Sequence, residues 1–112
     1  MIIVKIIMNA IPEKQKELVQ TLLSVTASME KEEGCLCHAL SCEIENINLL
    51  NLLVEWQTRK QLDHHLRSKM FGVLLGTKSL LDKPHTIHIY TVHRSEGMEA
   101  VHTARGKERN RA

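Results

Sequence analysis

Two stretches of this chain carry apolar side chains on both faces of the strands that they are predicted to form. Residues 2–10, IIVKIIMNA, and residues 49–57, LLNLLVEWQ, are rich in β-branched and aliphatic residues. Apolar residues occur in both alternating sets of positions, with Ile3, Ile7, Leu49 and Leu53 in the second set. Successive side chains of a strand point to opposite faces of its sheet. A sheet that contains these strands therefore has to bury both faces, whereas one wet face would show apolar and polar residues in alternation.

A chain of 112 residues forms one domain and has little material for a second covering layer. At roughly 25 cal/mol per Å² of apolar surface, leaving one face in water would forgo several kcal/mol per chain. A homodimer packed sheet against sheet is the simplest way to cover that face. The alternative is an exposed apolar patch without a defined partner, which soluble proteins rarely tolerate at this size.

The first predicted helix covers residues 13–32. Pro12 suits the first turn of a helix, and Gly34 is placed to end the helix as a C-cap. Apolar residues recur at spacings of four, three and four, which is the pattern of one helical face. These residues are Leu18, Leu22, Val25 and Met29.

The second predicted helix starts at Thr58, whose T-R-K-Q context matches a capping box. Its expected apolar face consists of Leu62, His65 and Leu66, with Val73 and Leu74 further along. His64 and Asp63 then face outward. Gly72 and Gly76 indicate that the segment after Phe71 is less regular.

Residues 35–43 and 85–93 supply two further predicted strands, so the expected order of elements is β-α-β-β-α-β. This order is typical of a ferredoxin-like α+β fold, in which an antiparallel sheet carries two helices on one face. The domain is expected to span residues 1–93. Residues 94–112 form a polar, weakly basic C-terminal tail, in which residues 97–105 form either a short helix or part of a mobile end.

The charge balance gives little support to a nucleic-acid partner. The net charge is +2, with ten basic and ten acidic side chains in residues 1–93 and five basic and three acidic side chains in the tail. There is no apolar run of membrane-spanning length, and residues 1–10 lack the features of a signal peptide. We therefore expect a cytoplasmic protein without a nucleic-acid or membrane partner.

The chain has three cysteines, Cys35, Cys37 and Cys42. An odd number at this spacing predicts neither a disulfide framework nor a zinc knuckle, so reduced thiols that act as small apolar residues are expected. On a regular strand, Cys35 and Cys37 share one face and Cys42 lies on the other.

Three motifs in order along the chain resemble the antibiotic biosynthesis monooxygenase (ABM) superfamily. Members of that superfamily show a G-C-L-x-[YF]-x-L strand, a strand that ends in E-W, and a helix with L-x-x-H-L followed by Phe. The matching residues here are Gly34, Cys35, Leu36, His38 and Leu40, then Glu55 and Trp56, and then Leu62, His65, Leu66 and Phe71. The opening strand followed by I-P-E-K is also similar, and the resemblance covers residues 1–93.

The resemblance implies a dimeric α/β barrel with a pocket in each subunit between the sheet and its helices. It also implies a monooxygenase that uses no flavin, haem or metal. In such enzymes an electron-rich quinol or polyphenol-like substrate loses a proton, and the resulting anion passes an electron to O₂. The protein then has to bind, orient and stabilise that anion.

His65 is the candidate catalytic residue, because an inward histidine can donate, accept or take a proton from the substrate oxygen. The alternative is a core histidine that is hydrogen-bonded to a strand carbonyl. His38 stands where the family has an aromatic residue, and it is expected on one strand face with Leu36, Leu40 and Cys42. It either makes the pocket more polar or lies at a surface edge.

Trp56, Phe71 and Asn9 are the other candidate substrate-binding residues. Trp56 and Phe71 are two of only three aromatic residues, and each either lines a pocket or fills the core. Asn9 follows a buried strand, where it either reaches a ligand or serves a turn. Glu55 lies on the strand face opposite Trp56, so a place in the dimer interface or a capping contact is expected.

The histidines near the last strand do not form a metal-binding pattern. His88 points opposite to His85 and His93, and no carboxylate pattern accompanies them, so no metal site is predicted. Two classes of function remain open: a cofactor-independent monooxygenase, and a non-catalytic dimeric protein that binds small molecules with the same fold.

Overall fold

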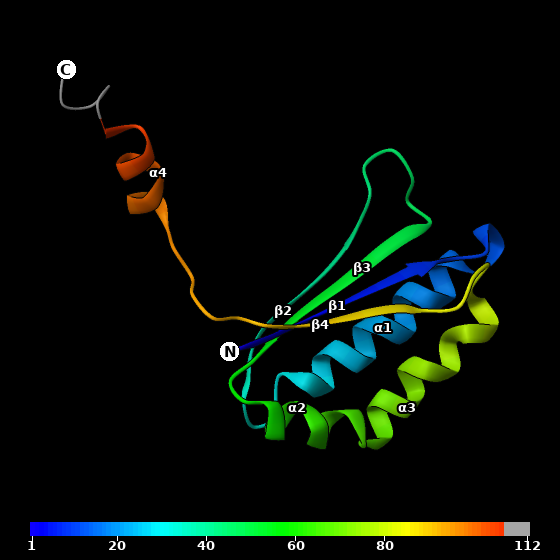
Figure 1. Cartoon of the computed structure of the whole chain (residues 1–112). Helices are drawn as coiled ribbons and strands as arrows, with labels where there is room; N and C mark the ends of the chain where they lie inside the picture. Colours follow the sequence, from blue (N-terminus) through cyan, green and yellow to red (C-terminus); the bar gives the residue numbers. More distant parts are fainter. Residues whose placement is uncertain (107–112) are drawn as a thin grey trace.

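The computed structural model describes residues 1–106 and joins all four predicted strands in one antiparallel sheet (Figure 1). The strands are β1 Ile2–Asn9, β2 Cys35–Cys42, β3 Leu49–Trp56 and β4 Thr86–Thr91. They lie in the order β2-β3-β1-β4, so the two strands that are apolar on both faces occupy the centre. This order confirms the ferredoxin-like α+β fold.

Three helices lie on one side of the sheet, and a fourth lies beyond its end (Figure 1). The first three are α1 Gln15–Met29, α2 Arg59–Leu66 and α3 Lys69–Gly76, and the fourth is α4 Met98–Ala104. Short 3₁₀ turns, η1 Pro12–Lys14 and η2 Thr77–Leu80, precede α1 and follow α3. The short-helix expectation for residues 97–105 is therefore confirmed, while residues 107–112 of the predicted tail lie outside the described range.

The second predicted helix is divided into α2 and α3. Thr58 caps α2 as expected, with its side-chain oxygen accepting from the backbone N–H of Gln61. Ser68 Oγ accepts from the N–H of Phe71 at 3.2 Å and so starts α3 as a new helix. The expectation of irregular structure after Phe71 is wrong, because α3 runs through Gly72 without interruption. The new helix turns Leu74 into the core and leaves Val73 partly exposed, contrary to the prediction for Val73.

The face of the sheet under the helices forms the core. Buried side chains alternate along the two central strands, as predicted, and consist of Ile2, Val4, Ile6 and Met8 with Leu50, Leu52, Val54 and Trp56. Leu18, Leu22, Val25 and Met29 of α1 are fully buried against them. The apolar face of α1, whose residues recur every three or four positions, therefore packs on the sheet face whose residues recur every two positions.

The opposite face of the sheet, called the open face below, carries Ile3, Ile7, Leu53 and Glu55. Ile3 and Ile7 are half-buried by their neighbours, and Leu53 is 41% exposed. Within the described single chain the helices α1–α3 cover only the other face (Figure 1). These helices therefore leave the second face uncovered, and on it Ile3, Ile7 and Leu53 alternate with Lys5, Asn51 and Glu55, so it is less apolar than predicted.

An irregularity at the start of β2 changes which residues share a face. Cys35 pairs with Trp56, but Cys37 pairs with Glu55, so one residue is inserted between them. Because a slip of one residue exchanges the faces, Cys35 packs against the core while Cys37 lies on the open face. The expectation that Cys35 and Cys37 share a face is therefore wrong.

Beyond this bulge the predicted neighbours of His38 are confirmed. His38 pairs with Val54, Leu40 with Leu52 and Cys42 with Leu50, so all three lie on the helix-covered face. Cys42 therefore lies on the same side as Cys35, contrary to the prediction. Leu36 is the inserted residue and is exposed.

Gly34 is the one described residue with a strongly positive φ, at 88°, and replacing it with alanine is expected to destabilise the fold. An added Cβ would lie 2.8 Å from Cβ of Gln61, which packs directly over this glycine. We expect Gly34→Ala to lower the free energy of unfolding by at least about 1–2 kcal/mol in urea denaturation.

Gly72→Ala is the matched control for this prediction. Gly72 lies in α3, and an added Cβ meets nothing within 4 Å. The substitution is expected to raise the free energy of unfolding by up to about 1 kcal/mol through helix propensity. Equal effects of the two substitutions would contradict the proposed role of Gly34.

Candidate functional site

His65 is buried at the centre of three rings. α2 turns its side chain inward, as predicted, and only 4% of the residue is exposed. Its ring lies 4.8 Å from that of Trp56 at a tilt of 31°, and 5.3 Å from that of Phe71 in an edge-on arrangement. The structure therefore brings together three of the predicted site residues, which we call the aromatic cluster: Trp56, His65 and Phe71.

Glu32 is the polar partner of His65. Its Oε2 lies 2.7 Å from Nδ1 of the imidazole. The alternative of a core histidine agrees with this burial, but the strand carbonyl expected as its partner is wrong, because the observed partner is a carboxylate. Sequence reasoning missed Glu32, since it lies among Glu30 and Glu33 at the end of a helix, where a run of charges usually faces solvent.

This contact leaves the second ring nitrogen of His65 available. A carboxylate only accepts, so Nδ1–H donates to Glu32 and the lone pair of the neutral ring resides on Nε2. Nε2 makes no hydrogen bond within residues 1–106. Every completely buried side-chain nitrogen or oxygen in that range has a hydrogen-bond partner. Nε2 therefore keeps some contact with solvent, although only 4% of the residue is exposed and the polar hollow described below is not lined by His65.

His38 faces the helix side of edge strand β2 and is half-buried. Its Nε2 lies 3.3 Å from Oε1 of Glu30. Both predicted site histidines thus face a carboxylate from the segment that links α1 to β2. They are held by different carboxylates and do not contact each other in the described part of the chain.

Asn9 lies far from the aromatic cluster. It pairs with Leu49 at one end of β1, whereas Ile2 pairs with Trp56 at the other end. Asn9 lies seven positions after Ile2 along the strand, which corresponds to roughly 23 Å. The backbone carbonyl of Asn9 accepts a hydrogen bond from the N–H of Asp82 at 2.7 Å. This contact anchors the segment between η2 and β4 to the end of β1.

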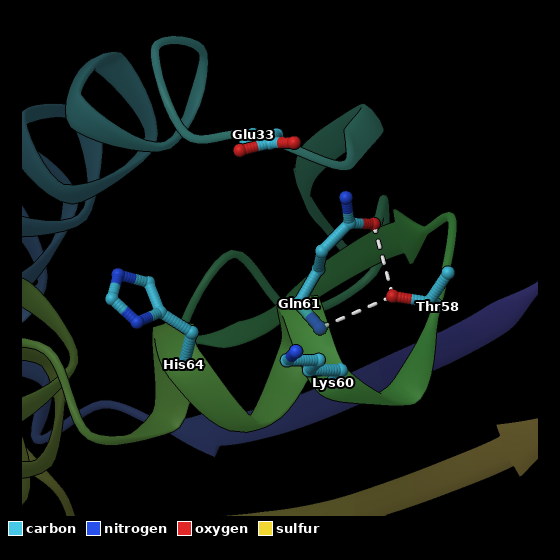
Figure 2. Close-up of a pocket in the computed structure, with 5 residues that line it drawn as sticks. All are labelled: Glu33, Thr58, Lys60, Gln61 and His64. Carbon is cyan, nitrogen blue, oxygen red and sulfur yellow. Dashed lines mark hydrogen bonds between the residues drawn. The ribbon is translucent and has the colours of Figure 1, made fainter.

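A polar hollow of about 380 Å³ lies beside the site (Figure 2). Figure 2 shows Glu33 on the α1–β2 connection, opposite Gln61 and His64 of α2. Glu33 and His64 are the sequence neighbours of Glu32 and His65, and His64 is exposed as predicted. Thr58 and Lys60 complete the lining. The hollow therefore borders α2 and the α1–β2 connection, which carry His65 and Glu32.

Glu55 lies on the open face and accepts a hydrogen bond from Cys37. The Sγ–Oε2 distance is 2.9 Å. This bond, followed by slight burial and by the charge of Glu55, raises the pKa of the Cys37 thiol above its ordinary value. The predicted position of Glu55, opposite Trp56, is confirmed.

The remaining histidines serve other contacts. Nε2 of His85 lies 2.9 Å from Oγ1 of the buried Thr77 and 3.1 Å from the carbonyl of Leu74, and burial lowers the pKa of this imidazole. His88 stacks on Tyr90. Among residues 1–106, no three His, Cys, Asp or Glu side chains lie together as metal ligands.

No helix of the described range has both the length and the apolar character needed to cross a membrane.

The ABM family model, described as antibiotic biosynthesis monooxygenase, matches residues 1–74. A conserved protein from Methanosarcina mazei Go1 is 34% identical over 80% of this chain and 89% of its own, with a TM-score of 0.76. No curated protein matches the sequence.

Two more distant structures share the fold. An antibiotic biosynthesis monooxygenase has a TM-score of 0.77 and 17% identity, over 84% of this chain and 100% of its own. Rv0793 from Mycobacterium tuberculosis has a TM-score of 0.78 and 18% identity, over 86% of this chain and 98% of its own.

The Cys37–Glu55 bond predicts the reactivity of an exposed thiol. Glu55→Gln removes the negative charge that disfavours the thiolate, so the pKa of Cys37 should fall. Near pH 7.5 we expect iodoacetamide to alkylate Cys37 roughly severalfold faster in this variant, as measured by peptide mass spectrometry. Cys42, which is exposed and not bonded to Glu55, is the internal control. An unchanged rate at Cys37 would contradict the contribution of the bond.

Proposed function

The chain belongs to the antibiotic biosynthesis monooxygenase family, and we propose that it is a cofactor-independent monooxygenase acting on a small quinol or polyphenol-like substrate. One observation carries the proposal: Glu32 holds Nδ1 of His65 and leaves Nε2 without a hydrogen bond in the described residues, beside the rings of Trp56 and Phe71. Family and fold alone do not determine an activity, so the proposed activity is derived from what these side chains can do.

His65 is equipped to act as a general base. The carboxylate of Glu32 holds the ring in the tautomer whose Nε2 accepts a proton, and it stabilises the imidazolium that forms. The surrounding rings of Trp56 and Phe71 exclude water and strengthen this interaction. We assign proton removal to His65 and the orientation of its ring to Glu32.

In the proposed reaction a phenolic O–H of the substrate gives its proton to Nε2, and the anion passes one electron to O₂. The substrate radical and superoxide then form a C–O bond at a ring carbon that carries hydrogen, adjacent to or opposite the phenolic oxygen. Breaking the O–O bond converts that carbon into a carbonyl, and the departing oxygen leaves as water with the proton that His65 held and the hydrogen lost from that carbon. One oxygen atom of O₂ enters the product and the other enters water.

Trp56 and Phe71 are the proposed contacts for the aromatic ring of the substrate, since both already pack against the imidazole. His38 is proposed as a second polar contact from the same face of the sheet. Asn9 is separated from these residues by most of β1, and a substrate contact of Asn9 stays a prediction without support from its position.

A non-catalytic dimeric protein that binds small molecules is the second candidate. It is favoured by the burial of His65, because Trp56 and Phe71 fill the space on two sides of its ring. In this case Glu32 and His65 form a buried polar pair that holds α2 to the end of α1.

The proposal includes a homodimer formed through the open face. Ile3, Ile7 and Leu53 present apolar surface there around Lys5, and a second copy of the sheet matches this mixed surface in size and character. Two-fold symmetry brings the same face of both copies together, so one surface supplies both sides of the interface.

The first test measures oxygen consumption with a panel of hydroquinones and anthrone-like phenols. His65→Gln keeps a polar side chain but removes the base, and we expect turnover to fall by about 10²–10⁴-fold. Glu32→Gln should lower turnover by roughly tenfold to a hundredfold, because the ring loses its charged partner. Labelled ¹⁸O₂ should place one atom in the product.

Glu17→Gln, an exposed substitution on α1, is the control for this experiment and should leave turnover unchanged. If both His65→Gln and Glu32→Gln kept wild-type turnover, the roles assigned to these residues would be lost. Binding of the phenols without oxygen consumption would instead support the non-catalytic candidate.

The second test concerns the dimer. Leu53→Glu places a charge in the middle of the open face, and we expect the dimer dissociation constant to rise roughly tenfold or more in sedimentation experiments. Leu75→Glu is the matched control, because Leu75 has similar exposure on the helix side of the molecule. Equal dissociation constants for the two variants would argue against pairing through this face.

A further inference from the structure

α4 is an amphipathic helix that stands away from the rest of the molecule. At 100° per residue, Met98, Ala100, Val101 and Ala104 occupy one side of this helix, and Glu99, His102 and Thr103 occupy the other. Met98 is 63% exposed and Val101 is 48% exposed. In Figure 1 the chain leaves β4 and carries α4 away from the layer of α1–α3.

A helix of this length needs a packing partner. α4 has seven residues, and isolated helices shorter than about 12–15 residues are marginal in water. The radius of gyration is 17.4 Å, whereas a compact chain of this length has about 13 Å. Within residues 1–106 the chain is therefore extended by a segment whose apolar side packs on no other layer.

The molecule also offers an apolar groove that α4 of the same chain does not fill. The groove has a volume of about 230 Å³ and lies between α1 and edge strand β2. Val19 and Leu23 line it from α1, with Leu40 and Leu50 from the sheet. Leu23 is 54% exposed, so its side chain is accessible to a docking segment. The groove is suited to two or three aliphatic side chains from a short helix.

The connection to α4 is too short to reach this groove within one chain. From Thr91 to Met98 a fully extended chain spans roughly 25 Å at most. Measured from Thr91, the groove lies three strand spacings across the sheet, because β4 and β2 are its two edges. It also lies six residues along the strands, because Thr91 pairs with Ile2 whereas Leu50 pairs with Met8. That distance is roughly 24 Å in a straight line through the protein, so any route around the sheet is longer.

We propose that α4 is an exchanged arm: α4 of one copy docks, by Met98 and Val101, in the groove between α1 and β2 of a second copy of this chain. The family match ends at residue 74, so α4 is an addition to the matched part of the domain. The direction in which α4 leaves the sheet, away from its own helix layer, points it toward a copy seated on the open face (Figure 1). The arm does not depend on the proposed catalytic activity.

The test compares charged substitutions on the two sides of α4 in the full-length protein. Met98→Glu/Val101→Glu and, separately, Leu23→Glu should each raise the dimer dissociation constant roughly tenfold or more in sedimentation experiments. Thr103→Glu adds a charge to the polar side of the same helix and should change nothing. A double variant that dissociates like the wild type, or a protein that is monomeric at all concentrations, overturns the proposal.

A cross-linking experiment tests the position of the arm. A copy carrying Val101→Cys is mixed with a differently tagged copy carrying Leu23→Cys, and mild oxidation should give a covalent product that joins the two tags. His102→Cys mixed with Leu23→Cys is the control from the polar side of α4, and unsubstituted copies give the background of the native cysteines. Cross-linking no greater than this background overturns the proposal. An internal link in a chain carrying both Val101→Cys and Leu23→Cys also overturns it, because α4 then packs on its own groove.

Discussion

The central pair of strands, β1 and β3, carries apolar side chains on both faces, and the rest of the structure depends on that constraint. One face is entirely apolar and is covered by α1, α2 and α3, whose buried side chains complete the core. The other face mixes Ile3, Ile7 and Leu53 with polar residues and lacks a layer from these helices, which makes a second copy part of the proposed architecture. Polar groups are excluded from the middle of the helix-covered face, and both histidines of interest lie at its margin, on β2 and α2.

Two local irregularities place polar groups at that margin. Gly34 adopts a positive φ directly after the acidic end of α1, and it brings Gln61 of α2 close to the turn. The bulge that follows directs His38 to the helix side and Cys37 to the open face. As a result, Glu32 points back to the buried His65, while Glu30 reaches His38 from the solvent side. The site is thus a product of how the chain leaves α1.

Much of the fold and part of the site could be predicted from residue periodicity. Alternation along β1 and β3, and the face of α1 that carries Leu18 and Met29, depend on repeats that a sequence displays directly. The inward direction of His65 follows from its spacing to Leu62. The break between α2 and α3 could not be predicted in this way, because it depends on Ser68 forming a cap, and a single serine is a weak signal within a helical pattern.

By itself, the sequence determined the order of the elements, the two apolar faces of the central strands and the inward position of His65, since each depends on a local repeat. Tertiary structure decided what His65 contacts. Glu32 lies 33 positions away along the chain, and the two meet only because α2 returns beside the end of α1. Tertiary structure also separated Asn9 from Trp56, although both lie on central strands, because antiparallel pairing places them at opposite ends. Contacts of this kind depend on long-range chain geometry, which no periodicity within one element encodes.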